Sequence, residues 1–226
     1  MSRKMSCLSL PAVLLLLFIF PVFSGVQAQV NLKAGYNFSM MSDPGLNQVI
    51  STFTENQSYD RGFKKVSWLH GLEAGIRFKA DIHAFELTYQ SAYQALSANG
   101  TLQPESVTYT DKINMSVNSI SGGYQLAGDF VGGGLDLQYQ RYNARVRLEG
   151  QDEFRNTQEM WGLKFYMMLT LEGSGNIDAA VQPYVVVPFG LYETDPLSLY
   201  LNQEPGPEGK KWMRVGFTLV FYNGGK

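Results

Sequence analysis

Cysteine is nearly absent from this 226-residue sequence, which has a single one, Cys7. One cysteine excludes a disulfide-stapled scaffold. Charged residues are also scarce, at 17% against about 25% in an average globular domain. The formal net charge of −2 and the sequence pI of about 5.7 exclude a strongly basic chain, so we expect no nucleic-acid partner. Aromatic residues reach 13%, which argues against intrinsic disorder.

Long hydrophobic runs are missing after residue 28. A transmembrane helix needs about 20 consecutive, mostly apolar residues, and the mean hydropathy of −0.13 also disfavours a bundle of membrane helices. These two absences exclude only helices. A membrane barrel turns half of its side chains toward a polar lumen, so its mean hydropathy lies near zero.

The first 28 residues have the three-part layout of a secretory signal peptide. Two basic residues precede an almost wholly apolar stretch at 8–23, and small side chains stand just before an expected cut after Ala28. We therefore expect residues 1–28 to be removed and residues 29–226 to form one exported barrel domain. An uncleaved anchor helix is the alternative. Its core of 16 residues, interrupted by two prolines, is short for a span of about 20.

The exported part alternates between apolar and polar residues with a period of two, as strands between two different environments do. One face of the first run carries Val30, Leu32 and Ala34, and the other carries Asn31 and Lys33. Eight runs follow one another, at about residues 30–40, 68–79, 85–94, 107–127, 131–148, 161–172, 177–189 and 212–222. Most reach the length of a membrane-spanning strand, about 9–11 residues. The pattern predicts an all-β fold, an eight-stranded antiparallel up-and-down transmembrane β-barrel.

Two runs change phase along their length. The fifth does so over residues 142–148. In the fourth, Ile113 and Val117 lie on one parity, whereas Ile120 lies on the other. One extra residue near 118–119 would reconcile the two halves of the fourth run, so we expect a β-bulge there.

The connections between the runs are alternately short and long. Short turns with suitable Gly, Asp and Asn chemistry fall at 80–81, 128–129 and 173–176, and long connections at 41–66, 97–106, 149–158 and 191–211. Outer-membrane barrels have short periplasmic turns and longer extracellular loops. We therefore expect the chain in the cell outer membrane, with both mature termini periplasmic and the long loops extracellular.

Alternation alone does not say which face meets lipid, because a soluble lipocalin-like barrel alternates too. Aromatic residues near the strand ends favour the membrane, since they would form the two girdles of a membrane barrel. They are Trp68, Tyr93 and Trp161 toward the long loops, and Phe78, Phe85, Phe221 and Tyr222 toward the short turns.

The opposite face would then line the lumen. Its charged residues are Lys33, Glu73, Arg77, Lys79, Glu86, Asp136, Lys164, Glu172 and Arg214. An eight-stranded barrel has room inside for little more than side chains, and buried charges are usually paired. We therefore expect a structural network of ion pairs, with a narrow channel as an alternative.

With these features the chain resembles the small eight-stranded outer-membrane barrels, including the OmpA/OmpX-like barrels and the porin-family, PorT-like barrel proteins. The resemblance covers about residues 29–222 and rests on the signal peptide, the eight runs, the loop asymmetry and the aromatic last run at 215–222. Residues 223–226 follow that run, whereas many members end on the aromatic itself. The resemblance implies outer-membrane lipid and lipopolysaccharide as surroundings. It implies the barrel-assembly machinery, which reads the last strand, and other outer-membrane proteins as partners.

The residues offer little catalytic chemistry. Some small barrels modify lipid A with a histidine beside a serine or an acid near the outer rim. Here His70 has Ser67 and Glu73 as its nearest polar neighbours, and Glu73 lies on the opposite face. His83 lies beside a short turn, on the wrong side for such chemistry. We expect no catalytic, cofactor-binding or metal site, and keep a lipid A-modifying enzyme as the alternative function.

Two further motifs favour structure over chemistry. Asp152, Glu153 and Glu159 could attract calcium or the divalent ions that bridge lipopolysaccharide, but they match no EF-hand and are better explained as a solvated face. Residues 132–134 are three glycines before a strand, not before a helix, so they form no phosphate loop. Close strand packing or a bend explains them better.

Two long connections carry apolar residues that either cap the barrel or dock a partner. They are Val49, Ile50, Phe53, Tyr59 and Phe63 in the first, and Leu197, Leu199, Tyr200 and Leu201 in the last. Together these observations indicate a non-enzymatic outer-membrane barrel. We expect an envelope structural or interaction role, which includes that of an accessory subunit in a larger outer-membrane complex.

Overall fold

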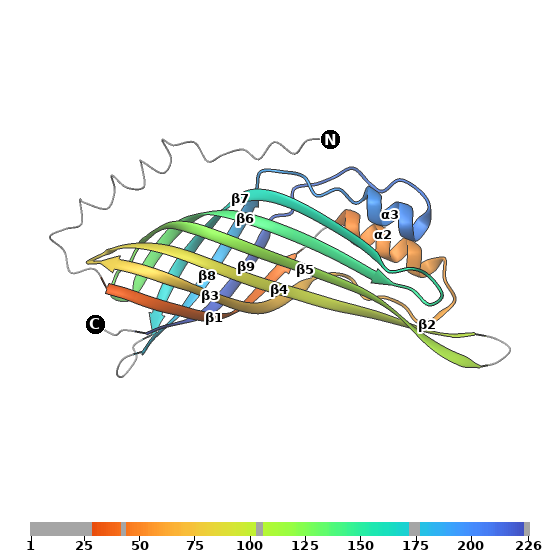
Figure 1. Cartoon of the computed structure of the whole chain (residues 1–226), viewed down its shortest axis with the longest axis horizontal. Coiled ribbons are helices and arrows are strands. Elements are labelled where there is room, and N and C mark those ends of the chain that lie inside the picture. The colour runs from red at the N-terminus through yellow and green to blue at the C-terminus, as the bar shows by residue number, and fades with distance from the viewer. Residues whose placement is uncertain (1–28, 42–43, 103–105, 172–176, 224–226) are drawn as a thin grey trace.

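The structure is a computed structural model that describes residues 29–41, 44–102, 106–171 and 177–223. Within these residues, eight long strands form a closed antiparallel barrel (Figure 1). They are β1 (Gln29–Met41), β3 (Trp68–Ala80), β4 (His83–Leu102), β5 (Val107–Leu126), β6 (Val131–Arg147), β7 (Phe154–Leu171), β8 (Ile177–Pro188) and β9 (Arg214–Asn223). Neighbours follow the order β4-β3-β1-β9-β8-β7-β6-β5, and pairing of β4 with β5 closes the ring. The predicted fold class is confirmed.

Several predictions fall outside the described residues. They concern the signal peptide at 1–28, Glu172, the short turn at 173–176 and the tail at 224–226. The other two short turns are described. Asp81 and Ile82 connect β3 to β4, with Asp81 in the left-handed region at φ 56°, which aspartate tolerates. Residues 127–130 connect β5 to β6. These turns define the turn end of the barrel, and the opposite end is the loop end.

The two faces of the barrel wall differ as the alternation predicts. On β1, Val30 and Leu32 are 60% and 58% exposed, whereas Lys33 is 3% exposed. Exposed large apolar side chains occur on all eight long strands. Soluble proteins rarely expose an apolar patch of more than a few hundred Å². An apolar band around the whole wall therefore identifies a transmembrane barrel, and the soluble lipocalin-like alternative is wrong.

Aromatic residues border this band at both ends. Those that point outward are Trp68, Tyr93 and Trp161 toward the loop end, and Phe78, Phe85 and Phe221 toward the turn end. Tyr222 was expected among them but is buried in the lumen, at 1% exposure. The prediction for Tyr222 was wrong because adjacent residues of a strand point to opposite faces, and Phe221 already points outward.

The predicted β-bulge at 118–119 is not found in β5, which is described in full. These residues pair in unbroken register with β4 on one side and β6 on the other. Instead, the interior changes along the strand. Toward the loop end Ile113 and Val117 point into a buried apolar core, whereas Ile120 nearer the turn end points outward. The phase change at 142–148 has the same cause, because Tyr142, Val146 and their inward neighbours join that core.

Two predicted loops are shorter than expected because the strands continue past the aromatic border. β4 and β5 extend to Leu102 and from Val107, so most of the predicted loop 97–106 is a hairpin that projects beyond the barrel (Figure 1). β7 already begins at Phe154, inside the predicted loop 149–158. The barrel wall thus rises above the membrane band on one side.

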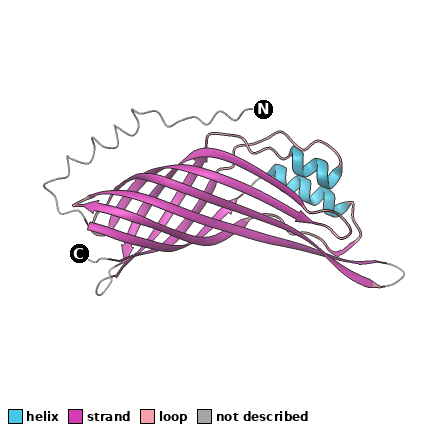
Figure 2. Cartoon of the chain, in the orientation of Figure 1, coloured by secondary structure: helices cyan, strands magenta, loops and turns pink. Residues whose placement is uncertain are grey.

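The other two long connections contain helices. The first includes α2 (Pro44–Glu55) and the short β2 (Tyr59–Arg61), which pairs with β4 outside the ring. The last includes α3 (Asp195–Asn202). The two helices lie side by side at the loop end (Figure 2). Within the described residues, no helix has both the length and the apolar character needed to cross a membrane.

Candidate functional site

The lumen is built around Lys33, which β1 turns inward. Its Nζ atom lies 2.6 Å from Oε1 of Glu73 on β3 and 2.8 Å from Oε2 of Glu86 on β4. All three side chains are at most 1% exposed. One ammonium therefore bridges two carboxylates on neighbouring strands, which offsets the desolvation of all three charges.

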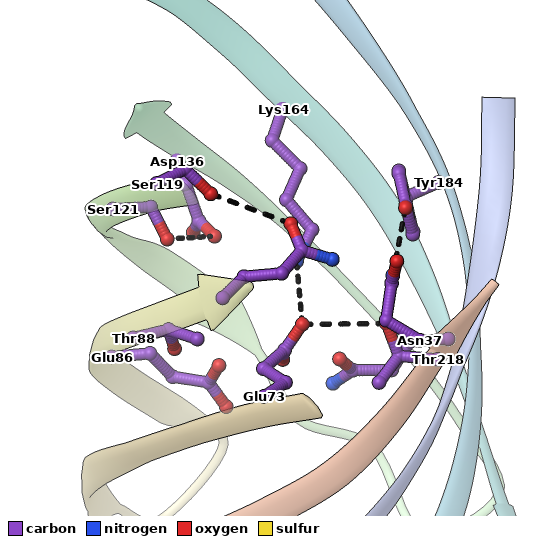
Figure 3. A network of polar contacts seen from close by, with 12 residues as sticks. Asn37, Glu73, Glu86, Thr88, Ser119, Ser121, Asp136, Lys164, Tyr184 and Thr218 are labelled. Carbon is purple, nitrogen blue, oxygen red and sulfur yellow. Dashed lines mark hydrogen bonds and ion pairs between the residues drawn. The ribbon is translucent and has the colours of Figure 1, made fainter. Parts of the chain in front are cut away.

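A second cation extends this cluster across the lumen. Lys164 on β7 lies 3.5 Å from Oε2 of Glu73, and Thr218 of β9 donates a hydrogen bond to the same oxygen at 3.3 Å (Figure 3). Asp136 is the register partner of Lys164 and accepts a hydrogen bond from Ser121 at 3.4 Å. The network thus joins strands from opposite sides of the barrel.

Tyr222 connects the ion pairs to the turn end of the lumen. Its hydroxyl donates to Glu86 at 2.8 Å and accepts from Gln182 at 2.9 Å. The guanidinium carbon of Arg77 lies 3.6 Å from the centre of the Tyr222 ring, and Arg77 also donates to Asn31. Within the described residues Arg77 has no ion pair, so its charge is stabilised by the cation–π contact with Tyr222 and the hydrogen bonds to the Asn31 amide.

Arg214 occupies the middle of the lumen toward the loop end. It is fully buried and donates to the amide oxygens of Gln140 at 3.1 Å and Gln138 at 3.4 Å. Tyr142 also donates to the Gln140 oxygen, at 2.8 Å. No carboxylate of the described residues lies within 4.0 Å of Arg214. The side-chain amides of Gln138 and Gln140 therefore stabilise its charge.

The predicted lumen charges are therefore largely confirmed. Lys33, Arg77, Glu73, Glu86, Asp136, Lys164 and Arg214 are all buried. Lys79 is only partly buried, and Glu172 lies outside the described residues. Ion pairs, amides and hydroxyls fill the middle of the tube, as expected for a structural network.

An apolar cap fills the loop end above Arg214. Trp212 is 1% exposed, and its ring stacks on Tyr192 with centroids 3.5 Å apart and meets Tyr142 edge-on at 5.4 Å. The helices add further buried side chains to the same cluster. They are Leu46, Val49, Ile50 and Phe53 from α2, and Leu197 and Leu201 from α3. Most of these loop residues therefore cap the barrel, whereas Leu199 is 50% exposed. Docking of a partner stays a prediction.

Asp111 links the cap to the part of the barrel wall that extends past the aromatic border. One carboxylate oxygen accepts a hydrogen bond from the Tyr59 hydroxyl at 2.5 Å, and the other accepts one from the backbone N–H of Glu149 at 2.7 Å. Burial, together with this carboxylate, raises the pKa of Tyr59 well above its ordinary value. The neutral hydroxyl thus remains a donor that links β2 to β5.

The turn end of the lumen is hollow. A cavity of about 480 Å³ lies there, and its lining includes Arg77, Lys79, Asp178 and Tyr222. The interior is therefore polar and open at the turn end, charged in the middle and filled with apolar side chains at the loop end. The apolar filling of the loop end leaves ions no continuous polar path through the barrel, which argues against the narrow-channel alternative.

The candidate catalytic residues are not brought together. Nδ1 of His70 lies 2.7 Å from the hydroxyl of Tyr36, and its ring contacts Tyr93, both on the outer face. Glu73 points into the lumen and binds Lys33 instead. His83 bonds to the Tyr124 hydroxyl near the turn end. These contacts are those of histidines in aromatic girdles.

Two of the three acidic residues considered for divalent ions, Glu153 and Glu159, contact arginines instead. Glu153 lies 2.5–3.1 Å from Nε of Arg145, Arg147 and Arg155. Hydrogen bonds from Arg147 and Arg155 lower the pKa of Glu153 below its ordinary value. No group of three metal-ligating residues occurs within the described part of the chain. The arginine cluster was not predicted, although its spacing of two residues on β6 was visible in the sequence.

The three glycines at 132–134 lie inside β6, as the close-packing interpretation predicts. Gly134 is the register partner of Tyr166 on β7. A Cβ atom at Gly134 would collide with the Tyr166 ring. The absence of a side chain thus makes room for a tyrosine in the narrow lumen.

No protein-family model matches the sequence, and no curated protein matches it. Among solved structures, the chain is similar to Ail, the attachment invasion locus protein of Yersinia pestis, in complex with the heparin analogue sucrose octasulfate. That match has 8% identity and a TM-score of 0.50 and covers 87% of this chain and 97% of the other. Neisserial surface protein A matches with 11% identity, coverage of 88% and 99%, and a TM-score of 0.45. At such identities the likeness concerns the fold alone, which is that of the small eight-stranded outer-membrane β-barrels.

Proposed function

We propose that the chain is a non-conducting, non-enzymatic barrel of the outer membrane with an envelope structural or interaction role. The observation that carries this proposal is the filled interior, in which the ion-pair network around Lys33 is closed off by the apolar cap around Trp212. A lumen built this way stabilises the wall and transports nothing. The outward position of His70 and the inward position of Glu73 support a role without catalysis.

In the proposed orientation the turn end lies in the periplasm and the loop end outside the cell. β1 begins and β9 ends at the turn end, which suits a chain exported into the periplasm. The loop end then presents α2, α3 and the projecting β4–β5 hairpin to the exterior (Figure 1). These elements are the surface through which another envelope protein would be bound.

Planar-bilayer recording tests the closed lumen. We expect the purified, folded protein to show no unitary conductance, because the apolar cap leaves no continuous polar path at the loop end. A general porin inserted into the same bilayer serves as the control for insertion and recording. Clear single-channel steps from the wild-type protein would contradict the proposal.

A gentle-detergent pull-down with mass spectrometry tests the interaction role. We expect the tagged chain to co-purify with other outer-membrane proteins. A matched variant replaces residues 101–108 by Asn-Gly, which keeps the register partners Gly100 and Tyr109, the pairing of β2 with β4 and the contact of Asp111 with Tyr59. Loss of the partners from this variant, with heat-modifiable gel migration intact, would assign docking to the hairpin. A chain that co-purifies with nothing has a structural role only.

A further inference from the structure

The outward face of β6 changes character where it passes the aromatic border. From the turn end, Leu135, Leu137 and Tyr139 point outward, and Tyr139 packs against Trp161 of β7 with ring centroids 5.3 Å apart. Beyond this pair the outward positions on β6 include Arg141, Arg145 and Arg147. The outward side chains of β6 thus change from apolar or aromatic to arginine within two residues.

The neighbouring strands add cations to the same surface. Arg155 of β7 is the register partner of Arg145, and Lys112 of β5 is the register partner of Arg147. Adjacent strands lie about 4.8 Å apart, so these side chains stand next to each other. We define the arginine face as Lys112, Arg141, Arg145, Arg147 and Arg155.

The arginine face carries an excess of positive charge. Its acidic neighbours are Glu153, shared by three of the arginines, and Glu159, which lies 3.6 Å from Arg141. Five cations thus share two carboxylates within 4.0 Å, and the connection that follows β6 adds two exposed acids, Glu149 and Asp152, which form no ion pair with the face within the described residues. The four arginine side chains remain 46–66% exposed, so the carboxylates order the guanidinium groups without neutralising them.

The end of the arginine face nearest the aromatic border lies at the height of the lipid headgroups. Arg141 and Arg147 lie two and eight residues past Tyr139 on β6. At about 3.3 Å per residue and a strand tilt of about 40°, they stand roughly 5 Å and roughly 20 Å beyond the aromatic border. The polar zone of a bilayer begins at that border. The face therefore runs from the headgroup level outward.

We propose that the arginine face binds the phosphate groups of a phosphorylated glycolipid in the outer leaflet, directly and without a bridging divalent cation. The proposal rests on the outer-membrane location proposed above. Arginine presents a planar fork of donors that matches phosphate oxygens in pairs. Because the face is the side of the wall and continues the lipid band, its nearest anions are those of surrounding lipids, not of a soluble polymer above the cap.

Lipid binding to the folded, full-length protein tests the proposal. The probes are a phosphorylated lipopolysaccharide, the same lipopolysaccharide after dephosphorylation and a soluble sulfated polysaccharide, with binding measured by native mass spectrometry with and without EDTA. The test variant is R141Q/R145Q/R147Q/R155Q. Its matched control, K64Q/K65Q/K210Q/K211Q, removes four exposed cations from the loop end outside the arginine face.

We expect the arginine variant to bind the phosphorylated lipid at least about tenfold more weakly than wild type, since charge-assisted hydrogen bonds are lost, and the lysine control to bind like wild type. Equal weakening in both variants, equal binding of the dephosphorylated lipid, loss of binding in EDTA or preference for a soluble sulfated polysaccharide would each overturn the inference. Heat-modifiable gel migration separates the two proposals. A chain that does not fold as a barrel contradicts the proposed function, whereas a folded barrel without phosphate selectivity contradicts only this inference.

Discussion

Replacing Lys33 with methionine is expected to destabilise the folded barrel by about 3–5 kcal/mol, the cost of removing one partner from a buried ion pair. Lys33 contacts Glu73 at 2.6 Å and Glu86 at 2.8 Å. Without it, Glu73 keeps the more distant Lys164 and Glu86 keeps the Tyr222 hydroxyl. Urea-induced unfolding in lipid vesicles, followed by heat-modifiable gel migration, measures the loss.

Two matched variants separate charge from packing in this experiment. In K33M/E86Q the remaining Glu73 is paired with Lys164, so we expect more than half of the lost stability to return. In K79M the lysine that is removed also lies at an inward position, but it is partly exposed beside the cavity at the turn end. We expect this variant to lose less than about 1 kcal/mol of folding stability. If the double variant is no more stable than K33M, the loss reflects packing and the network is not electrostatic.

The wall of the barrel was predictable because each strand separates two unlike environments. Val30 and Lys33 differ in polarity and point to opposite sides, and alternation records that contrast directly. The same rule predicts that Lys164, Asp136 and Arg214 lie in the lumen. Their contacts were not predictable, since Glu73 and Lys164 lie 91 positions apart in the sequence and meet only when the ring closes.

The loop end was predicted less well because its interior is not polar. Alternation shows that two faces differ, but it does not say which one is apolar. Ile113 and Val117 therefore suggested a bulge, whereas they mark the level at which the lumen becomes an apolar core. That core depends on Trp212 and on the helix α2, which join β5 from distant parts of the chain.

The arginine face was missed for a different reason. Arg141, Arg145 and Arg147 share one parity in the sequence, but the phase change at 142–148 obscured which side that parity takes. The neighbouring acids Glu153 and Glu159 are also residue types that bind cations. The register of β6 with β7 shows that arginines already occupy those carboxylates.

Substituting Trp212 with alanine is expected to destabilise the cap by about 3–5 kcal/mol, the usual cost of truncating a large buried aromatic side chain. Trp212 is 1% exposed and contacts the rings of Tyr192 and Tyr142, which also contact each other. The barrel wall has its own backbone ladder, so we expect local opening while heat-modifiable migration persists. Limited proteolysis in folded vesicles measures this opening, and cleavage within residues 44–66 and 190–211 should become at least tenfold faster.

Trp161 provides the matched control, because it is the same residue type in a different environment. It is 51% exposed on the outer face at the aromatic border, so alanine there removes lipid contacts without touching the cap. We expect Trp161→Ala to leave cleavage of the loops unchanged. If both substitutions accelerate cleavage equally, the cap is not an independent apolar core, and its connections are protected by the membrane surface instead. If only Trp212→Ala accelerates cleavage, the lumen is closed by the apolar cap around Trp212. That cap lies at the level where the strand pattern changes phase.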